Sequence, residues 1–207
     1  MQAEKYESFR SESKKQTIFI CFNFVIWGIS DIMLDNIRED LGYKAELYFG
    51  NRSFISQFKA VFTEGFLPVL IFRMANFFYK YRLFLIGWLL KEFNHMVFRI
   101  LIGPNAKIGP GMVLAHSDGI VINCHADIGH HLILQHQVTI GQRNLLMPTV
   151  GNYVYCGCGS KVLGKITVGD HVKVGANAVV VKDAPPYCTV AGIPAKVVKQ
   201  YTPSDEK

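Results

Sequence analysis

Aliphatic residues recur at every sixth position in the C-terminal half of the chain. Three series share this period: Ile102, Ile108, Leu114 and Ile120; Ile128, Leu134 and Ile140; and Val150, Cys156, Val162, Val168, Val174 and Val180. Glycine often follows the repeated residue, as at Gly103, Gly109 and Gly151. Neither a helix nor an alternating strand produces a glycine-marked repeat of six, whereas a solenoid whose three flat sides each take about six residues does. The pattern therefore predicts a β-solenoid whose sides each point one aliphatic side chain into a continuous core.

The repeat is interrupted twice. The first two series are offset by two residues, between Ile120 and Ile128, and the register jumps again across residues 142–149. A solenoid breaks its stack where a loop leaves it, and such loops often carry functional residues.

The first half of the chain has a helical pattern. Residues 35–41 can open or continue a helix, and Pro68 stands in the first turn of a long apolar segment. We expect breaks at Gly42, Gly50 and Gly65. The predicted fold class is mixed α and all-β solenoid, in three parts: an N-terminal helical region over residues 1–99, a solenoid domain over residues 100–200 and a C-terminal tail over residues 201–207.

Two apolar segments bear on membrane contact. Residues 16–30 are uncharged but number 15, short of the roughly 18–20 needed to span a bilayer, so we expect a buried helix. Residues 66–99 are apolar and aromatic with several basic residues. They fit either a buried helical subdomain with charges at its rim or a surface that lies against an anionic membrane. The polar N-terminus lacks the pattern of a secretory signal, so we expect a cytoplasmic protein, located at the inner face of the membrane under the second interpretation.

Charge and cysteine content narrow the class of protein. The net charge of +6 suits nucleic acid, an anionic membrane or a phosphorylated cofactor, but no nucleic-acid-binding motif is present. Five scattered cysteines do not form a disulfide framework. The single residue between Cys156 and Cys158 is too short a spacing for an ordinary zinc pair. We expect a reduced protein without a metal.

Three motifs resemble one family. HSDGIVIN at 116–123, LILQHQVTIG at 132–141, and the run that begins CGCGSKVLG at 156 and closes on AGIPAKVV resemble the hexapeptide-repeat acyltransferases, in their serine acetyltransferase branch. The resemblance covers roughly residues 36–200. It implies a left-handed parallel β-helix, acetyl-CoA as co-substrate, and a homotrimer or a multiple of it, with acetyl-CoA in the cleft between neighbouring β-helices.

The resemblance assigns roles to particular residues. It places the family's catalytic base on His116, and a histidine suits the removal of a hydroxyl proton near neutral pH. His136, 20 residues further on, is expected to be its companion, whereas His125, His130 and His131 are expected to be solvated loop residues. The candidates for binding the cofactor are Cys158, Lys173, Ala176, Lys182, Lys196 and Lys199.

The chain also departs from the family. The aspartate that orients the base in serine acetyltransferases corresponds to Leu101, and their second active-site histidine corresponds to Met147. The Arg-Asp-Pro segment that helps to bind serine is not recognisable. With these departures the chain resembles the O-acetyltransferases of capsule and exopolysaccharide pathways. We therefore expect a sugar hydroxyl, free or lipid-linked, as the acceptor, and expect that L-serine is not accepted.

Two alternatives stay open. One is serine O-acetyltransferase activity, in cysteine biosynthesis. The other is an inactive β-helix that acts as a trimeric scaffold, although the retention of His116 within its motif argues against it.

Overall fold

The computed structural model of the protein describes residues 32–202 and residue 204. The chain divides after Asp35, and the second unit, Asn36–Lys207, holds nearly all of the described residues. The apolar run at residues 16–30 and the first cysteine, Cys21, lie outside the described residues.

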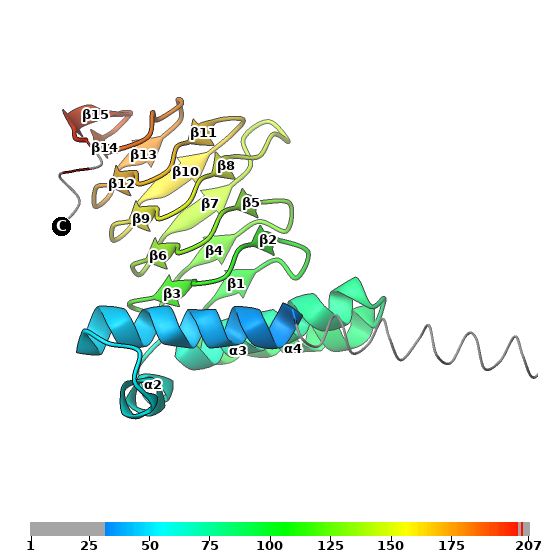
Figure 1. Cartoon of the computed structure of the whole chain (residues 1–207). Helices are drawn as coiled ribbons and strands as arrows, with labels where there is room; N and C mark the ends of the chain where they lie inside the picture. The colour runs from blue at the N-terminus through cyan, green and yellow to red at the C-terminus, as the bar shows by residue number, and fades with distance from the viewer. Residues whose placement is uncertain (1–31, 203, 205–207) are drawn as a thin grey trace, which may run out of the picture. The chain divides into compact units, whose positions relative to one another are not determined.

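Helices make up the first part of the described chain. Residues 32–49 are helical, and α2 (Phe54–Val61), α3 (Phe66–Lys80) and α4 (Phe84–Phe98) follow (Figure 1). The expected breaks at Gly50 and Gly65 are correct, since both residues adopt positive φ, of 74° and 87°. The expected break at Gly42 is wrong, because the helix runs through it. A single internal glycine costs a helix only about 1 kcal/mol, which packing can offset.

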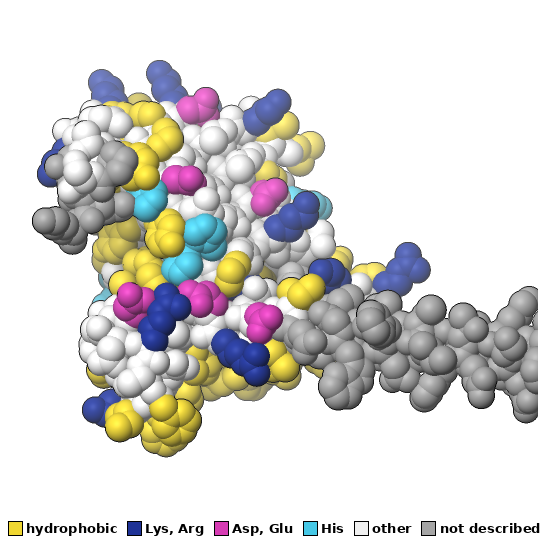
Figure 2. Space-filling view, viewed as in Figure 1, with side chains coloured by type: hydrophobic (Ala, Val, Ile, Leu, Met, Phe, Trp, Pro, Cys, Tyr) yellow, Lys and Arg dark blue, Asp and Glu magenta, His cyan; other side chains and the backbone are white. Residues whose placement is uncertain are grey.

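The segment at residues 66–99 forms two helices that differ in burial. Helix α3 packs its apolar face inward, with Phe72 and Val69 almost fully buried. Helix α4 buries only Gly87 and Asn94. Its apolar side chains are largely exposed; the exposed fraction of Met96, for example, is 75 %. Hydrophobic side chains also gather over α2 at the bottom of Figure 2. The segment is thus a helical subdomain with an exposed apolar face.

No helix in the described part of the chain is long and apolar enough to cross a membrane alone. Only α2 and α3 taken together, across a bend of 85°, have the length and composition to do so. Peripheral membrane contact through residues 66–99 stays a prediction.

The solenoid consists of three parallel sheets, and successive coils add one strand to each. The five-stranded sheet has the order β1-β4-β7-β10-β13, the four-stranded sheet β11-β8-β5-β2, and the six-stranded sheet β15-β14-β12-β9-β6-β3. Among the named strands of the described residues, only the last pair, β14 and β15, is antiparallel. The strands are β1 (Leu101–Ile102), β2 (Lys107–Ile108), β3 (Val113–Leu114), β4 (Val121–Ile122), β5 (Asp127–Ile128), β6 (Ile133–Leu134), β7 (Thr139–Gly141), β8 (Thr149–Val150), β9 (Tyr155–Cys156), β10 (Lys161–Leu163), β11 (Thr167–Val168), β12 (Lys173–Val174), β13 (Val179–Val180), β14 (Cys188–Gly192) and β15 (Ala195–Gln200).

The predicted fold class, helices followed by a solenoid of six-residue repeats, is confirmed. The core is a stack of the repeated aliphatic residues, nearly all of them buried. Glycines between coils allow close backbone approach: a Cβ on Gly103 would lie 2.3 Å from the Cα of Cys124 in the next coil.

The first interruption of the repeat lies elsewhere than expected. Ile102 pairs with Ile122, which pairs in turn with Ile140, so Ile122 and not Ile120 continues the series. Ile120 is buried two residues earlier in the coil. The two extra residues therefore lie between β3 and β4, and the loop that they enlarge carries His116.

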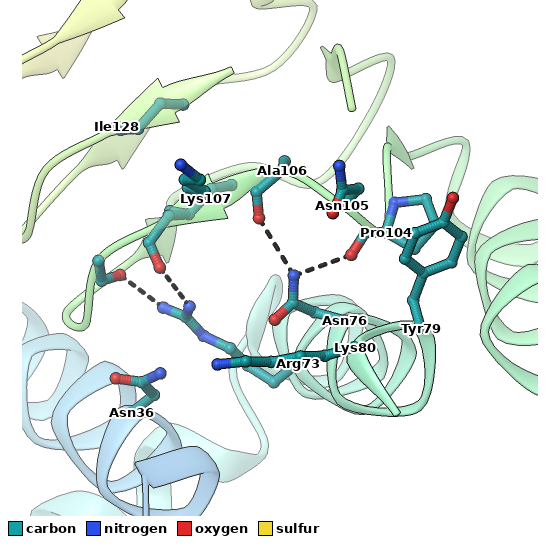
Figure 3. Close-up of a pocket in the computed structure, with 12 residues that line it drawn as sticks. Asn36, Arg73, Asn76, Tyr79, Lys80, Pro104, Asn105, Ala106, Lys107 and Ile128 are labelled. Atoms are coloured by element: carbon teal, nitrogen blue, oxygen red, sulfur yellow. Dashed lines mark hydrogen bonds between the residues drawn. The ribbon is translucent and has the colours of Figure 1, made fainter. Parts of the chain in front are cut away.

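Two side chains of α3 join the helices to the first coil (Figure 3). Arg73 donates to the backbone oxygens of Ile108 and Gly109, both at 2.7 Å, and forms a buried ion pair with Asp40. Asn76 donates to the backbone oxygens of Pro104 and Ala106. The first coil is thus held by polar contacts as well as by apolar packing.

Candidate active site

His116 lies on the corner that follows β3, at the foot of the solenoid. Its side chain is 59 % exposed, and its ring centroid lies 5.9 Å from that of His136, at an interplanar angle of 69°. His136 follows β6 in the next coil. The expectation that the two histidines lie together is met by this geometry, while their roles in catalysis stay a prediction.

A carboxylate that the sequence interpretation did not include faces His116. Glu64 Oε2 lies 3.3 Å from His116 Nδ1. Its other oxygen, Oε1, accepts hydrogen bonds from the backbone N–H of Ser117 at 2.6 Å and from the Ser117 hydroxyl at 3.1 Å. The Ser117 N–H, with a smaller contribution from His116, holds the pKa of Glu64 below its ordinary value. Glu64 is thus an ionised partner for the imidazole.

Two side chains of the helix at residues 32–49 hydrogen-bond to the backbone on either side of the contact between Glu64 and His116. Lys44 donates to the backbone oxygen of Glu64 and, at 3.2 Å, to that of Leu114. Tyr48, one turn further on, donates to the backbone oxygen of Ala115 at 3.2 Å. Burial lowers the pKa of Lys44 to about 8. These two side chains hold the backbone that carries Glu64 against the backbone that carries His116.

Glycine is required where the α2–α3 turn meets the first coil. A Cβ on Gly65 would lie 2.1 Å from the backbone oxygen of Leu114, and the positive φ of Gly65 also disfavours a side chain. The close approach brings Glu64 within reach of His116.

Four of the predicted site residues share one edge of the solenoid. His116, His136, Cys158 and Ala176 follow β3, β6, β9 and β12, the successive strands of one sheet. Backbone hydrogen bonds run along this edge, from Gly159 to His136 at 2.9 Å and from Asn177 to Cys158 at 2.7 Å. The edge forms a straight track along the solenoid axis.

The predicted cofactor lysines lie towards the C-terminal end of the solenoid. Lys173 on β12 pairs in register with Thr189 on β14, which pairs with Lys199 on β15. Lys196 lies on the same final strand, and Lys182 follows β13 in the five-stranded sheet. All four lysines are exposed. Three of them are therefore grouped on one sheet, and Lys182 belongs to another.

The two positions that depart from the family are occupied by apolar packing. Leu101 lies on β1 and lines a cavity of about 420 Å³ that Trp88 and Val121 also line. Met147 packs against the hydrophobic core. Neither side chain can orient or replace a catalytic histidine.

Another cavity, of about 450 Å³, lies between α3 and the first coil (Figure 3) and is lined in part by Arg73, Asn76 and Lys107. It contains none of the predicted site residues.

Within residues 32–202, no group of three or more His, Cys, Asp or Glu side chains is placed to hold a metal ion. The four described cysteines are free thiols.

One histidine expected to be a solvated loop residue belongs to a stack of rings instead. The rings of His131, Tyr153, His171 and Tyr187 stack at successive centroid distances of 4.7, 4.8 and 4.6 Å. His131 is only 13 % exposed and lies 3.0 Å from a carboxylate oxygen of Glu39. The expectation was wrong for His131, because the next coil places the ring of Tyr153 above it. It was also wrong for His130, which is half-buried with its ring 4.9 Å from those of His131 and Tyr153. His125 is exposed, as expected.

A solenoid of six-residue repeats, with a paired histidine on one edge and lysines at the end of that edge, defines a hexapeptide-repeat acyltransferase. Known proteins identify the branch. The chain is 40 % identical over 138 residues to the serine acetyltransferase of Helicobacter pylori, a match that covers 65 % of this chain and 81 % of that protein. It is 37 % identical over 138 residues to the serine acetyltransferase of Synechococcus elongatus, covering 65 % of this chain and 57 % of that protein. No family model matches the chain.

Solved structures agree. The crystal structure of Neisseria gonorrhoeae serine acetyltransferase superposes with a TM-score of 0.77 at 28 % identity, covering 87 % of this chain and 72 % of that one. A serine acetyltransferase in complex with CoA gives a TM-score of 0.75 at 27 % identity, covering 83 % and 72 %. The chain belongs to the serine acetyltransferase family of left-handed β-helix acyltransferases. The expected class of enzyme, acetyl-CoA-dependent acyltransferase, is confirmed by this membership.

The expected acceptor is corrected by the same comparisons. A sugar hydroxyl, and with it a place in capsule or exopolysaccharide biosynthesis, does not fit relatives that are named serine acetyltransferases. The sugar interpretation relied on three departures from the family: Leu101, Met147 and the unrecognisable Arg-Asp-Pro segment. At the first of these departures the structure shows a carboxylate from elsewhere in the chain: Glu64, 52 residues before His116, faces the His116 ring.

Proposed function

We propose that this protein transfers the acetyl group of acetyl-CoA to the hydroxyl of L-serine. The observation that carries the proposal is the pairing of His116, in its HSDGIVIN motif, with the carboxylate of Glu64 at 3.3 Å. Membership of the serine acetyltransferase family supports serine as the acceptor. The chain spans 57 % of the Synechococcus protein, so activity is a property to be measured on this chain itself.

In the proposed reaction His116 acts as general base through Nε2, because Nδ1 faces Glu64. It takes the hydroxyl proton as the serine oxygen attacks the thioester carbonyl. A carbon–oxygen bond forms, the carbon–sulfur bond breaks, and the proton passes from the imidazole to the CoA sulfur. His136, 5.9 Å away between ring centroids, is proposed to line the same acceptor site.

The edge of the solenoid supports a binding track for acetyl-CoA. Three coil steps separate His116 from Ala176, roughly 14 Å at about 4.8 Å per strand. Cys158 and Ala176 are small enough for an extended pantetheine arm to lie against the backbone. We propose that Lys173, Lys196 and Lys199 meet the phosphates beyond this arm, with Lys182 contributing from the adjoining sheet.

A homotrimer is part of the proposal. The loop at residues 142–149 leaves the solenoid and exposes Leu145 by 84 % and Leu146 by 49 %. Contiguous exposed apolar side chains of this kind suit an interface. Replacing both leucines with Asp should shift sedimentation toward the monomer; an unchanged assembly would remove the loop from the interface.

We also propose a cytoplasmic location, which the free thiols support.

The function is tested by incubating the full chain with acetyl-CoA and L-serine. Thiol release and mass detection of O-acetylserine should both rise saturably with L-serine, and D-serine and an acceptor-free sample serve as controls. Thioester cleavage that L-serine does not increase would refute the proposed acceptor. If CoA nevertheless binds, that result would favour the inactive trimeric scaffold.

A further inference from the structure

Glu64 is separated from His116 by the boundary between the helices and the solenoid, yet its carboxylate is held on that histidine. Both oxygens are engaged: Oε1 by the Ser117 N–H at 2.6 Å and Ser117 hydroxyl at 3.1 Å, and Oε2 by His116 Nδ1 at 3.3 Å. Ser117 is the next residue after His116, so one carboxylate engages the histidine and its neighbour together. This arrangement restricts the rotation of the imidazole.

The backbone at both sides of the contact is fixed by one cation. Lys44, 2 % exposed, donates to the backbone oxygens of Glu64 and Leu114. A Cβ on the intervening Gly65 would collide with Leu114, so the turn and the coil are in direct contact. The position of Glu64 is therefore determined by the fold and not by its own side-chain preferences.

Glu64 is also the only acidic residue between Glu46 and Glu92. The residue at the position of the family's orienting aspartate is Leu101, which lines an apolar cavity with Trp88. An imidazole that serves as a base through Nε2 needs an acceptor at Nδ1–H to fix its tautomer and to stabilise the imidazolium that forms. Among the residues that the structure describes, Glu64 is the carboxylate within 4.0 Å of the His116 ring nitrogens.

We propose that Glu64 is the positioning residue for His116, and that the α2–α3 turn supplies the carboxylate which the first coil lacks. Glu64 accepts the Nδ1–H of His116, leaving the Nε2 lone pair for the acceptor hydroxyl. It acts through His116 and does not bind the ammonium group of the acceptor. This inference rests on the proposed acetyl transfer, but the tautomer of His116 can be tested without it.

Glu64→Gln is the informative variant. A glutamine can still accept from the Ser117 N–H through its carbonyl oxygen, which turns its NH₂ group toward His116 Nδ1 and favours the opposite tautomer. The kcat for O-acetylserine formation should fall by roughly 10- to 100-fold, less than the ~10²–10⁴ expected for loss of the base itself. The KM values for L-serine and acetyl-CoA should stay within about twofold. Because Glu64 is 54 % exposed, the fold should persist, which a thermal melt checks.

A spectroscopic measurement separates this role from a merely structural one. In ¹⁵N-labelled protein the ring nitrogens of His116, assigned by comparison with His116→Ala, should report an Nδ1–H tautomer in the wild type and a shift toward Nε2–H in Glu64→Gln. The matched control is Glu39→Gln, which alters another carboxylate–histidine contact, with His131 at 3.0 Å. It should leave both kcat and the His116 signals unchanged.

The outcomes are distinguishable. Wild-type protein that gives no serine-dependent transfer refutes the proposed function, while the tautomer measurement still decides the role of Glu64. Active wild type with an unchanged kcat or an unchanged tautomer in Glu64→Gln overturns the inference. A raised KM for L-serine with unchanged kcat would also overturn it, because Glu64 would then bind the acceptor.

Discussion

Asp40 and Arg73 form a buried ion pair. The Asp40 carboxylate accepts hydrogen bonds from Arg73 Nε at 2.8 Å and from Arg73 Nη2 at 2.9 Å. Asp40 is 1 % exposed and Arg73 is 5 % exposed. The same carboxylate accepts the backbone N–H of Met112 at 2.7 Å. One side-chain pair thus joins the helix at residues 32–49, α3 and the first coil.

Removing one member of this pair should destabilise the protein. Asp40→Asn leaves the Arg73 guanidinium buried without its counter-ion, for which a loss of about 3–5 kcal/mol in the free energy of unfolding is expected. Urea denaturation measures the loss. Glu46→Gln, which breaks the exposed ion pair between Glu46 and Arg52, is the matched control and should change stability little. Equal effects of the two variants would contradict the structural role of Asp40.

Gly65→Ala should disturb both stability and catalysis. The new Cβ would collide with the Leu114 backbone oxygen, separating the turn that carries Glu64 from the coil that carries His116. The melting temperature and kcat should both fall. Gly50→Ala is the control, because Gly50 also has positive φ but nothing lies within 4 Å of an added Cβ. If the two variants behave alike, backbone strain and not the close contact is the cause.

Lys44 should make stability depend on pH in the alkaline range. Its pKa is about 8 in the folded chain against 10.5 ordinarily, so between these pH values the unfolded chain binds the extra proton. Stability attributable to Lys44 should therefore rise with pH across that window, by about 3 kcal/mol in all. Unfolding free energies at pH 7 and pH 10 should show this rise in the wild type relative to Lys44→Met. Lys59→Met, at an exposed lysine on α2, should follow the wild type.

His116→Ala should lower acetyl transfer by roughly 10²–10⁴, as loss of a general base typically does. Affinity for CoA and the assembly state should be kept, since the side chain is largely exposed. Steady-state rates and calorimetric titration with CoA measure the two properties. His125→Ala, at an exposed histidine in another loop, should retain wild-type turnover. Near-wild-type turnover in His116→Ala would remove that residue from the mechanism.

Lys182 and Lys196 are predicted to contact the phosphates of the cofactor. Replacing both with Ala should weaken binding of CoA more than binding of dephospho-CoA, if either lysine meets the 3′-phosphate. Calorimetric titration with the two ligands gives the comparison. Lys161→Ala, at an exposed lysine on β10, should bind both ligands as the wild type does. An equal loss for both ligands would exclude the two lysines as the 3′-phosphate contact.

The solenoid could be read from the sequence because its periodicity is local. Each coil repeats the same inward aliphatic residue, and the shared edge of His116, His136, Cys158 and Ala176 follows from counting coils. The position of the first insertion could not be read in this way. Ile120 and Ile122 are both aliphatic and both buried, so hydrophobicity alone does not distinguish which one lies on the strand; the pairing of Ile122 with Ile102 does.

The carboxylate beside His116 was decided by tertiary structure alone. Glu64 belongs to no repeat and precedes His116 by 52 residues, and its approach depends on the buried Lys44, on Gly65 and on the packing of the helices against the first coil. The sequence does show that Leu101 stands where the family has an aspartate, but it does not show that the Glu64 carboxylate approaches His116. The six-residue repeat determines the solenoid through contacts between equivalent positions of adjacent coils, whereas the environment of His116 depends on contacts between segments that share no pattern.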